Sequence, residues 1–487
     1  RSSDVRVIAS YRLEDLPTGQ QLPKGFPKAR QTVHLGALSN SDLENLLQAL
    51  LTGEIEPALQ TELLLHADGN PWLLEERLKA MLESKAIGRH AGLWEWNRAQ
   101  ATLPDSLTGL LSHRVQQLTS ATLEFARAAS VLGRAFSFED ARALLDWSDD
   151  AALAGLEGLL RARFVVESPA SDGEVFRFTH PLYAELLRAG LMTLKRRRLH
   201  QRAATLLAGR TEPLELSEHF LAGEQWAQAL ESGLLAGQRA QGLAAYPQAE
   251  RAYRIALEAA LRLEALGTLT ADQALLGLQV RSALGEVLSF VGCNLQAMQL
   301  WVYTVQHAQG LSGSQQIAAR AKVNLVRAQR LSGALEAAQS LLGEPVAGEP
   351  LFADICTELC ALYATKGDAV KARRYGLQAL QAAKRDQNLE GMVKALMGLG
   401  MVKQSDGRKV RLLRFGIKVA TQYGNKHLLA RVWNDLGVAL YEVDRRAAFE
   451  AWRTAATFAD TAGDIALVMR LEINSALDFM QDMDFGA

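Results

Sequence analysis

The pattern of apolar and polar positions predicts helices along most of the chain. Leu43, Leu46, Leu47 and Leu50 recur at helical spacing behind a run of cap residues, which indicates a helix over 39–51. The same pattern predicts helices over 57–67, 72–84, 106–118, 120–132, 137–145, 149–162 and 181–191, and a long helix that starts near residue 193. Together these segments favour a mainly α fold.

A few short stretches have the pattern of strands. Residues 5–12 are an apolar run with a polar exit, and residues 93–96 alternate between apolar and polar. Residues 164–167 and 175–178 flank a glycine-containing turn, which is typical of a β-hairpin. Several helices followed by a hairpin predict a winged-helix domain in this part of the chain.

The prolines are unevenly spread. Nine of the twelve lie at or before Pro213. Proline breaks helix interiors, so the rest of the chain, which is rich in Ala and Leu, is expected to be nearly all helix. The first 213 residues are expected to be more mixed, and a domain boundary is predicted near residue 213.

Small and large residues recur at similar spacing in the helical part. In one unit Gly285, Ala297 and Trp301 mark the close approach of two helices, and the spacing recurs around Cys360 and Gly437. The second-helix anchors fall at 249, 297, 338, 372, 412 and 448. This pattern resembles the tetratricopeptide (TPR) repeat over roughly 214–482, in about six helix pairs. Such an α-solenoid superhelix has a concave face for ligands.

Composition and charge exclude several classes of protein. The chain has 53 basic and 54 acidic side chains, so it cannot coat nucleic acid with its whole surface, and any such binding would be local. Three cysteines are too few for a disulfide framework. No run is long and apolar enough for a membrane span, and no signal peptide opens the chain. We therefore expect a cytoplasmic protein without a membrane partner.

Three motifs in the first 213 residues together resemble the STAND family of signal-transducing, AAA-like ATPases. The strand over 5–12 ends in Tyr11-Arg12 and is similar to the family's sensor-1 strand. Gly69-Asn70-Pro71, followed by Trp72 and two glutamates, resembles its helical-lid motif, Gly-Asn-Pro-aromatic-x-x-Glu. Residues 176–182, which include His180, resemble its winged-helix histidine motif, and residues 196–200 match the usual exit into the repeats.

The resemblance implies a nucleotide-binding role for four residues. Arg12 would approach the γ-phosphate, Asn70 would face the nucleotide, Pro71 would pack on the adenine, and His180 would contact the β-phosphate of ADP. The implied cofactor is ATP or ADP in the full-length parent, with none in this chain as given. In bacteria this combination is typical of transcriptional activators that hold ADP at rest and form homo-oligomers when inducer and ATP bind.

The departures from the family pattern bear on activity. No Gly-x4-Gly-Lys-[Ser/Thr] occurs, so the phosphate cradle and its lysine are missing. This chain is therefore not expected to be an enzyme, although the parent could be an ATPase. The chain begins at Arg1 instead of Met, and we expect the phosphate-binding half of the ATPase core upstream. The C-terminus lacks the helix-turn-helix of many relatives, so DNA is expected to bind only through a segment absent here.

Each of the four residues also has a purely structural interpretation. Arg12 would be a surface residue at a strand exit. Asn70 would cap a helix that Pro71 opens, and this role holds whether or not nucleotide binds. His180 would be a hydrogen-bonded histidine of the core. For the nucleotide-facing role, both interpretations stay open.

Other polar or reactive groups have a ready structural explanation. Lys195 and Arg196–Arg198 could bind phosphate or DNA, but a solvated helix face or a contact with an acidic neighbouring domain is the simpler interpretation. Cys356 and Cys360 lie on one helix face without a nearby histidine, so we expect core packing and no metal site. No arrangement of residues predicts a catalytic group. Trp301 and Trp452 are expected to pack between repeats.

One polar stripe in the repeats is a candidate ligand site. Arg320, Asn324 and Arg327 share a face of a predicted first helix, and first helices line the concave side. The stripe could hold an anionic ligand or a sugar, as part of a surface for a protein partner or a small-molecule inducer. A solvated helix face is the alternative.

These expectations combine into one domain plan. It has an ATPase-core remnant over 1–36, a helical lid over 37–100, a winged-helix domain with connector over 101–213 and a TPR-like sensor over 214–487. The predicted function is the regulatory part of a STAND-type transcriptional regulator, in which the repeats bias an ADP/ATP switch. The alternatives are a TPR protein-interaction scaffold and the sensory half of a nucleotide cyclase or kinase.

Overall fold

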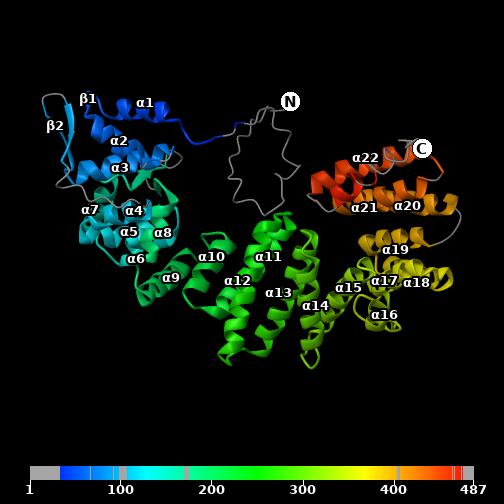
Figure 1. Cartoon of the computed structure of the whole chain (residues 1–487). Helices are drawn as coiled ribbons and strands as arrows, with labels where there is room; N and C mark the ends of the chain where they lie inside the picture. The colour runs from blue at the N-terminus through cyan, green and yellow to red at the C-terminus, as the bar shows by residue number, and fades with distance from the viewer. Residues whose placement is uncertain are drawn as a thin grey trace. The chain divides into compact units, whose positions relative to one another are not determined.

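A computed structural model of the chain describes most of the sequence (Figure 1). The described residues are 33, 35–65, 67, 69–90, 93–97, 107–168, 175–402, 406–441, 443–462, 464, 467–472 and 474. The predicted strand over 5–12, and Arg12 with it, lies outside the described residues. The predicted mainly α fold is confirmed.

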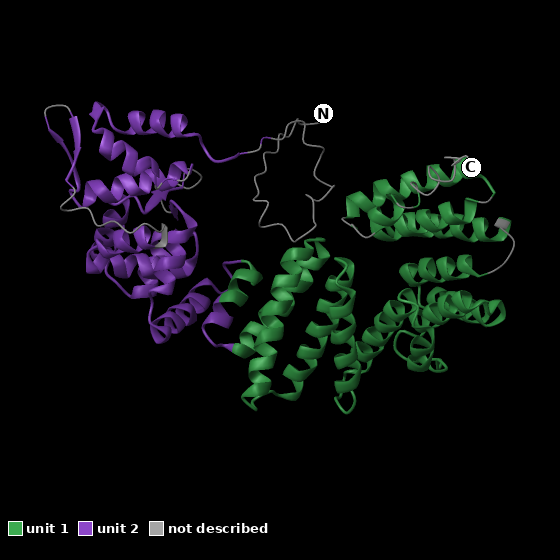
Figure 2. Cartoon of the chain, in the orientation of Figure 1, with its two compact units in different colours: residues 1–30, 212–218, 226–487 green, residues 31–211, 219–225 purple. Residues whose placement is uncertain are grey.

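The elements belong to two compact units, coloured separately in Figure 2. We call residues 31–211 and 219–225 the lid–winged-helix unit. The repeat unit includes residues 212–218 and 226–487. Helix α10 (Pro213–Ala222) is divided between the two units: its residues up to Glu218 belong to the repeat unit, and those from His219 belong to the lid–winged-helix unit.

The first part of the lid–winged-helix unit is a small helical domain with a three-stranded sheet. In the sheet, β3 lies between β1, which is parallel to it, and β2, which is antiparallel. Leu43, Leu59 and Leu74 from the three helices are fully buried in one core. The elements are α1 (Asn40–Leu50), β1 (Glu54–Ile55), α2 (Pro57–Leu65), α3 (Pro71–Glu83), β2 (Ile87–His90), β3 (Leu93–Trp96) and α4 (Leu107–Gln116).

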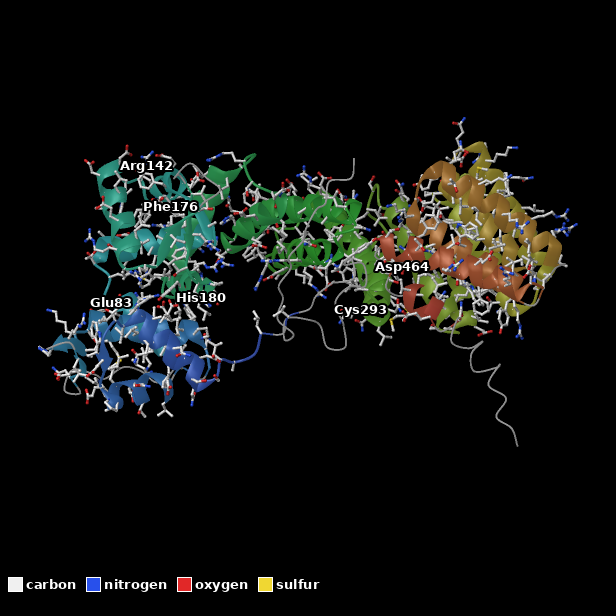
Figure 3. All side chains as sticks on the ribbon, turned by 90° about the horizontal axis from the view of Figure 1, so that it is seen from above. Glu83, Arg142, Phe176, His180, Cys293 and Asp464 are labelled. Carbon is white, nitrogen blue, oxygen red and sulfur yellow. The ribbon has the colours of Figure 1, made fainter. Side chains whose placement is uncertain are left out.

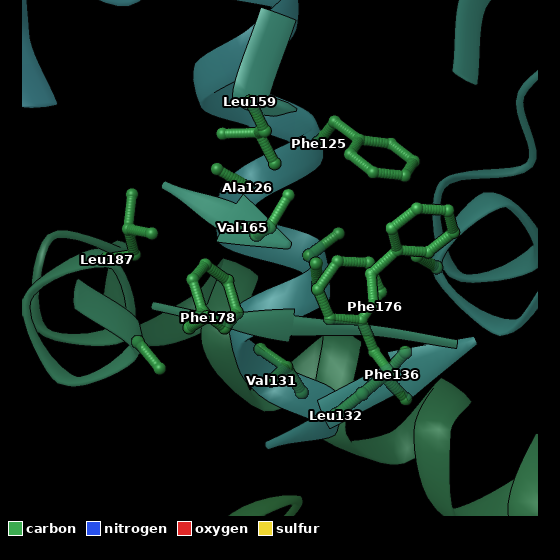
Figure 4. Packing of buried hydrophobic residues seen from close by; sticks show 14 of the residues in the cluster. Phe125, Ala126, Val131, Leu132, Phe136, Leu159, Val165, Phe176, Phe178 and Leu187 are labelled. Carbon is green, nitrogen blue, oxygen red and sulfur yellow. The ribbon is translucent and has the colours of Figure 1, made fainter. Parts of the chain in front are cut away.

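The second part is a winged helix. Its central strand β6 pairs antiparallel with β4 and with β5. Aromatic side chains of the strands and of α5 fill the core, among them Phe125, Phe136 and Phe178 (Figure 4). The elements are α5 (Ser120–Leu132), β4 (Ala135–Ser137), α6 (Phe138–Leu145), α7 (Asp149–Arg161), β5 (Val165–Glu167), β6 (Val175–Phe178) and α8 (Pro181–Ala189). The connector helix α9 (Thr193–Leu207) then packs on α5 and α6.

The repeat unit is an α-solenoid. Successive helices form antiparallel pairs, and each first helix also contacts the first helix of the next pair. The pairs begin at Trp226 and not at the predicted residue 214, because α10 precedes them as a separate helix. The described pairs are α11 (Trp226–Gly242) with α12 (Tyr246–Ala265), α13 (Ala271–Phe290) with α14 (Asn294–His307), α15 (Gln315–Leu331) with α16 (Leu335–Leu342), α17 (Phe352–Lys366) with α18 (Ala369–Arg385), α19 (Leu389–Met401) with α20 (Asp406–Tyr423), and α21 (Lys426–Leu440) with α22 (Arg445–Ala462).

The predicted anchor positions lie at the centre of this packing. Those at 249, 297, 338, 372 and 448 are alanines that expose none of their surface. The sixth, Leu412, is only half-buried, whereas its neighbour Leu413 is 1% exposed. The buried anchor of α20 is therefore Leu413, one residue after the predicted position. The repeats differ in length, so the spacing between anchors does not predict the residue at which each one falls.

The repeat tryptophans pack within a pair, which corrects the prediction that they lie between repeats. A Cβ added to Gly285 would lie 2.5 Å from Trp301 Nε1, and one added to Gly437 would lie 2.3 Å from Trp452 Nε1. Each indole N–H donates to a carbonyl of the facing helix, at 3.1 Å and 3.3 Å. Glycine is needed at both positions because a flat ring lies directly on the helix backbone.

Candidate functional site

Two helix starts carry the residues predicted to face a nucleotide. Asn70 caps α3 with its side-chain oxygen, which accepts from the backbone N–H groups of Trp72 at 3.0 Å and Leu73 at 3.3 Å. Pro71 occupies the first turn of α3. His180 caps α8 through Nδ1, which accepts from the backbone N–H of Leu182 at 3.3 Å. The structural interpretation of Asn70 as a cap and of Pro71 as an opening residue therefore holds. His180 is a half-buried helix cap instead of the core residue that its structural interpretation predicted.

The two motifs meet within the lid–winged-helix unit. The rings of Trp72 and His180 stack with centroids 3.7 Å apart and an interplanar angle of 15°. Figure 3 shows His180 and Glu83 where the lid helices face the winged helix. The starts of α3 and α8 are thus neighbours, and helix starts present free N–H groups and partial positive charge to an anion. Asn70, Pro71 and His180 are brought together, whereas Arg12 lies outside the described residues.

Behind this contact lies a buried ionic cluster that sequence reasoning missed. Arg114 of α4 has a side-chain exposure of 1%, as has Glu76 of α3, and the two form an ion pair. Arg114 also donates to Glu83 at 2.8 Å and to the carbonyl oxygen of Ala162 at 2.8 Å. Tyr183 of α8 is fully buried and donates its hydroxyl to Glu76. One guanidinium therefore ties the lid helices to the winged helix.

The electrostatics of the cluster follow from its burial and its partners. Burial alone would raise the pKa of Glu76, but Arg114, Tyr183 and Lys79 together lower it below its ordinary value. Burial, with the charge of Glu76, raises the pKa of Tyr183, so the phenol keeps its proton. The lid motif places its glutamate at Glu75, yet the buried carboxylate is the next residue, Glu76. An arginine two residues before the end of an amphipathic helix gives no signal in the sequence that it is buried.

The winged helix presents no basic helix to a groove of DNA. The second helix of a helix-turn-helix normally enters the groove, and here that helix is α7. Its exposed residues include Asp149, Asp150 and Glu157, which repel phosphate. In the basic run at α9, Lys195 pairs with Glu124 at 2.5 Å and Arg197 pairs with Glu224 at 2.7 Å.

The polar stripe of Arg320, Asn324 and Arg327 forms hydrogen bonds with glutamates of neighbouring helices. Arg320 and Asn324 of α15 both donate to Glu286 of α13, at 2.8 Å and 3.0 Å. Arg327 donates to Glu358 of α17 at 2.7 Å. These contacts cross from one pair to the next, so the three residues join neighbouring repeats. The acidic partners come from other helices and could not be inferred from the stripe.

Ion pairs continue along the first helices of the later pairs. The side chain of Glu358 is 4% exposed and also lies 3.4 Å from Arg330; the two arginines lower its pKa although burial alone would raise it. Lys394 of α19 pairs with Glu390 at 2.7 Å. Burial raises the pKa of Asp435 on α21 to about 6, in spite of the nearby Arg431. Basic and acidic side chains of the first helices therefore pair with one another, within one helix or between neighbouring helices.

Cys356 and Cys360 are free thiols in the core of the helix pair α17/α18. Cys356 and Cys360 expose none of their surface, and burial raises the pKa of each thiol to about 12. Cys360 stands where other pairs have glycine, and Gly376 faces it where they have an aromatic ring. Among the described residues, no three His, Cys, Asp or Glu side chains are grouped as metal ligands.

Comparison with known proteins gives only distant likenesses. No protein-family model matches the sequence, and no curated protein matches it. A STAND protein with a tetratricopeptide repeat sensor from Pyrococcus horikoshii aligns with a TM-score of 0.41 and 14% identity over 89% of this chain. This chain spans 62% of that structure. A circular tandem repeat protein aligns over 92% of this chain and 97% of its own, at 16% identity and a TM-score of 0.13.

Both TM-scores lie below 0.5, so the fold assignment rests on the helix packing described above. No helix in the described ranges has both the length and the apolar character to cross a membrane. On its fold, the chain is a mainly α protein in which a small helical domain and a winged helix precede an α-solenoid of helix pairs.

Proposed function

We propose that this chain is the regulatory part of a STAND-type transcriptional regulator. The starts of α3 and α8 would form one wall of an ADP/ATP site, and a P-loop module, which this sequence lacks, would supply the other wall. The repeats would sense a protein partner or a small-molecule inducer and bias the switch. On this proposal the chain itself binds no nucleotide tightly and catalyses no reaction.

The observation that supports this proposal is the stack of Trp72 on His180. It joins the two sequence motifs for which the resemblance implies nucleotide contact, although they are more than a hundred residues apart. The buried cluster around Arg114 holds the same two domains together. A ligand that binds one arrangement of lid and winged helix better than another would shift the balance between them.

In the repeat unit, a ligand on the polar stripe would have to displace the glutamates that now pair with its arginines. A ligand at Arg327 would have to replace Glu358, and a ligand at Arg320 would have to replace Glu286. Because these contacts join neighbouring pairs, ligand binding there would loosen or reset the joint between repeats. That is the step by which occupancy of the concave face would reach the lid and winged helix.

The test is nucleotide retention by the full-length protein that carries a P-loop module together with this chain. It is expected to purify with ADP, and His180→Ala should release the ADP and raise basal activity. His307→Ala is the matched control, since His307 is an exposed histidine of the repeat unit. Unchanged ADP affinity and basal activity in His180→Ala would exclude the proposed role of His180.

Two other functions are separated by the same measurement. If the full-length protein holds no nucleotide, the chain is a repeat scaffold for a protein partner. If it holds ADP but its output domain is a cyclase or a kinase, the switch is retained and the transcriptional role is wrong. The helix-pair packing supports an interaction surface in all three cases.

A further inference from the structure

Two second helices of the later pairs, α18 and α20, carry a strong excess of basic residues. Helix α20 carries Arg408, Lys409, Arg411, Arg414 and Lys418 against one acidic residue, Asp406, in a protein whose net charge is −1. Helix α18 carries five basic residues and no acidic one. On the first helices, by contrast, Arg320, Arg327 and Lys394 each form an ion pair with a glutamate of the same or a neighbouring first helix.

Four cations of α20 lack an acidic partner within the described part of the chain. Arg408, Arg411, Arg414 and Lys418 are exposed, and none of them forms an ion pair with a described residue. Arg411 bonds only to the carbonyl oxygen of Gly407 on its own helix, at 3.2 Å. Their spacing of three and four residues places the four side chains on one face of the helix.

A corresponding helix in the first pair shows the usual arrangement. Arg251, Arg254 and Arg262 lie on α12, and each has a glutamate within reach, at 2.7 Å, 2.7 Å and 3.7 Å. The three arginines of α12 thus have acidic partners, whereas the four cations of α20 have none among the described residues.

The length of this basic face suits a phosphate backbone. From Arg408 to Lys418 the helix rises about 15 Å, because each residue adds about 1.5 Å. One strand of duplex DNA places a charge about every 3.4 Å along its axis, so four side chains can each meet a phosphate. Three of the four are arginines, whose planar guanidinium groups match phosphate oxygens in pairs.

The opposite face of α20 argues against a membrane as the partner. Leu413, Val419 and Ala420 are buried in the core of the solenoid, so the helix has no free apolar face to insert between lipids. Phe415, 50% exposed among the cations, is the large apolar side chain that this face offers.

We propose that the face of α20 formed by Arg408, Arg411, Arg414 and Lys418 binds the phosphate backbone of duplex DNA without reading its sequence. Contacts to phosphate fix position and orientation, whereas sequence is read from base edges. The surface would hold the repeat unit against DNA beside a site that another segment recognises. This proposal needs no nucleotide switch, so it can succeed or fail independently of the proposed function.

The experiment measures binding of the chain to a short fluorescein-labelled DNA duplex by fluorescence anisotropy at several KCl concentrations. Four phosphate contacts predict a slope of about −3.6 for log K against log[salt], which weakens binding about 150-fold between about 50 and 200 mM salt. The triple variant Arg411→Gln, Arg414→Gln, Lys418→Gln should keep a slope of about −0.9 and weaken only about 3- to 4-fold over that range.

The matched control removes the same charge from another second helix. Arg251→Gln, Arg254→Gln, Arg262→Gln should bind the duplex like the wild type. Helical circular dichroism and melting temperature show whether either variant is misfolded; the substituted α20 side chains are exposed, so loss of fold is not expected.

Three results would overturn the proposal. The first is no duplex binding by the wild type at about 50 mM salt, a concentration at which such contacts are strong. The second is an equal loss in both triple variants, since net charge alone would then explain it. The third is binding to vesicles that contain phosphatidylserine, lost in the α20 variant while duplex binding is unchanged, which would make an anionic membrane the partner.

Discussion

The buried arginine between lid and winged helix gives the sharpest test of the packing. Replacing Arg114 by Met removes the guanidinium and leaves the carboxylate of Glu76 in a site where its side chain is 1% exposed. Lys79 still reaches Glu76 at 2.9 Å, but the contacts of Arg114 to Glu83 and to the carbonyl oxygen of Ala162 disappear. Breaking one side of a buried ion pair destabilises by about 3–5 kcal/mol.

Hydrogen exchange measured by mass spectrometry can locate this loss. A decrease of about 3–5 kcal/mol in opening free energy speeds exchange by roughly two to four orders of magnitude in α4 and α8. Peptides from the repeat unit should exchange as in the wild type, which makes them an internal control. Arg142→Met serves as a second control, because Arg142 is a surface residue with Glu139 and Asp149 as exposed partners.

The double variant Arg114→Met, Glu76→Leu separates charge from shape. Replacing both members of a buried pair by apolar groups is often close to neutral, so much of the protection should return. If Arg114→Met alone exchanges like the wild type, the cluster does not hold the two domains together and the reasoning is wrong. If the double variant is as unstable as the single one, lost packing explains the effect and the unpaired carboxylate does not.

The cluster also sets a direction for pH dependence. The pKa of Glu76 is lower in the folded chain than its ordinary value near 4.5. The folded state therefore holds this proton less readily than the unfolded state. The stabilisation from Glu76 is complete above pH 4.5 and is lost as the pH falls through the lowered pKa. In Glu76→Gln the acid-induced change in lid exchange should be smaller.

Three further predictions concern the repeats. Gly285→Ala puts a Cβ 2.5 Å from Trp301 Nε1 and should lower unfolding free energy by about 1–3 kcal/mol in thermal or denaturant melts. Asp435→Asn should raise the melting temperature at pH 7.5 but not near pH 4, because burial raises the pKa of this carboxyl to about 6 and disfavours its charged form. Iodoacetamide at pH 8 should add one label, at the exposed Cys293, since the other two thiols are buried with pKa values of about 12.

Each of these has a clear contrary outcome. A melt of Gly285→Ala equal to that of Gly242→Ala, where an added Cβ meets nothing within 4 Å, would show that the ring can move aside. If Asp435→Asn raises the melting temperature both at pH 7.5 and near pH 4, the charge of the carboxyl is excluded as the cause. Labelling of Cys360 in the native protein would mean that the α17/α18 pair opens readily.

Much of the repeat architecture could be predicted because close helix approach requires small residues at fixed positions. Ala249, Ala297 and Ala372 are buried at the predicted anchors for that reason. The predicted anchor of α20 was wrong by one residue, because Leu413 and not Leu412 is buried. When repeats differ in length, the position of one anchor does not fix the position of the next. The strands β1, β2 and β4 have two to four residues, so their pairing depends on tertiary neighbours and not on their own pattern.

The candidate site was predictable only in part. The cap Asn70 follows from its residue type, whereas His180 was not predicted to be a cap. The contact of Trp72 with His180 depends on how two domains pack. Likewise, the polar stripe that ends at Arg327 is visible in the sequence. Its contact with Glu358 is not, because Glu358 lies on the next helix pair. Arg114 could not be recognised, because a long charged side chain on an amphipathic helix is exposed in most proteins.

The pair α15/α16 gives the repeat unit an uneven mechanical character. Its second helix has eight residues, the shortest among the described pairs, and neither helix contains an aromatic residue to seat on a facing glycine. The pairs α13/α14 and α21/α22 have a tryptophan pressed onto such a glycine. Under a pulling force along the solenoid, we expect extension to begin at α15/α16. The helix pairs before and after it would stay stiff and would pivot about this more compliant pair.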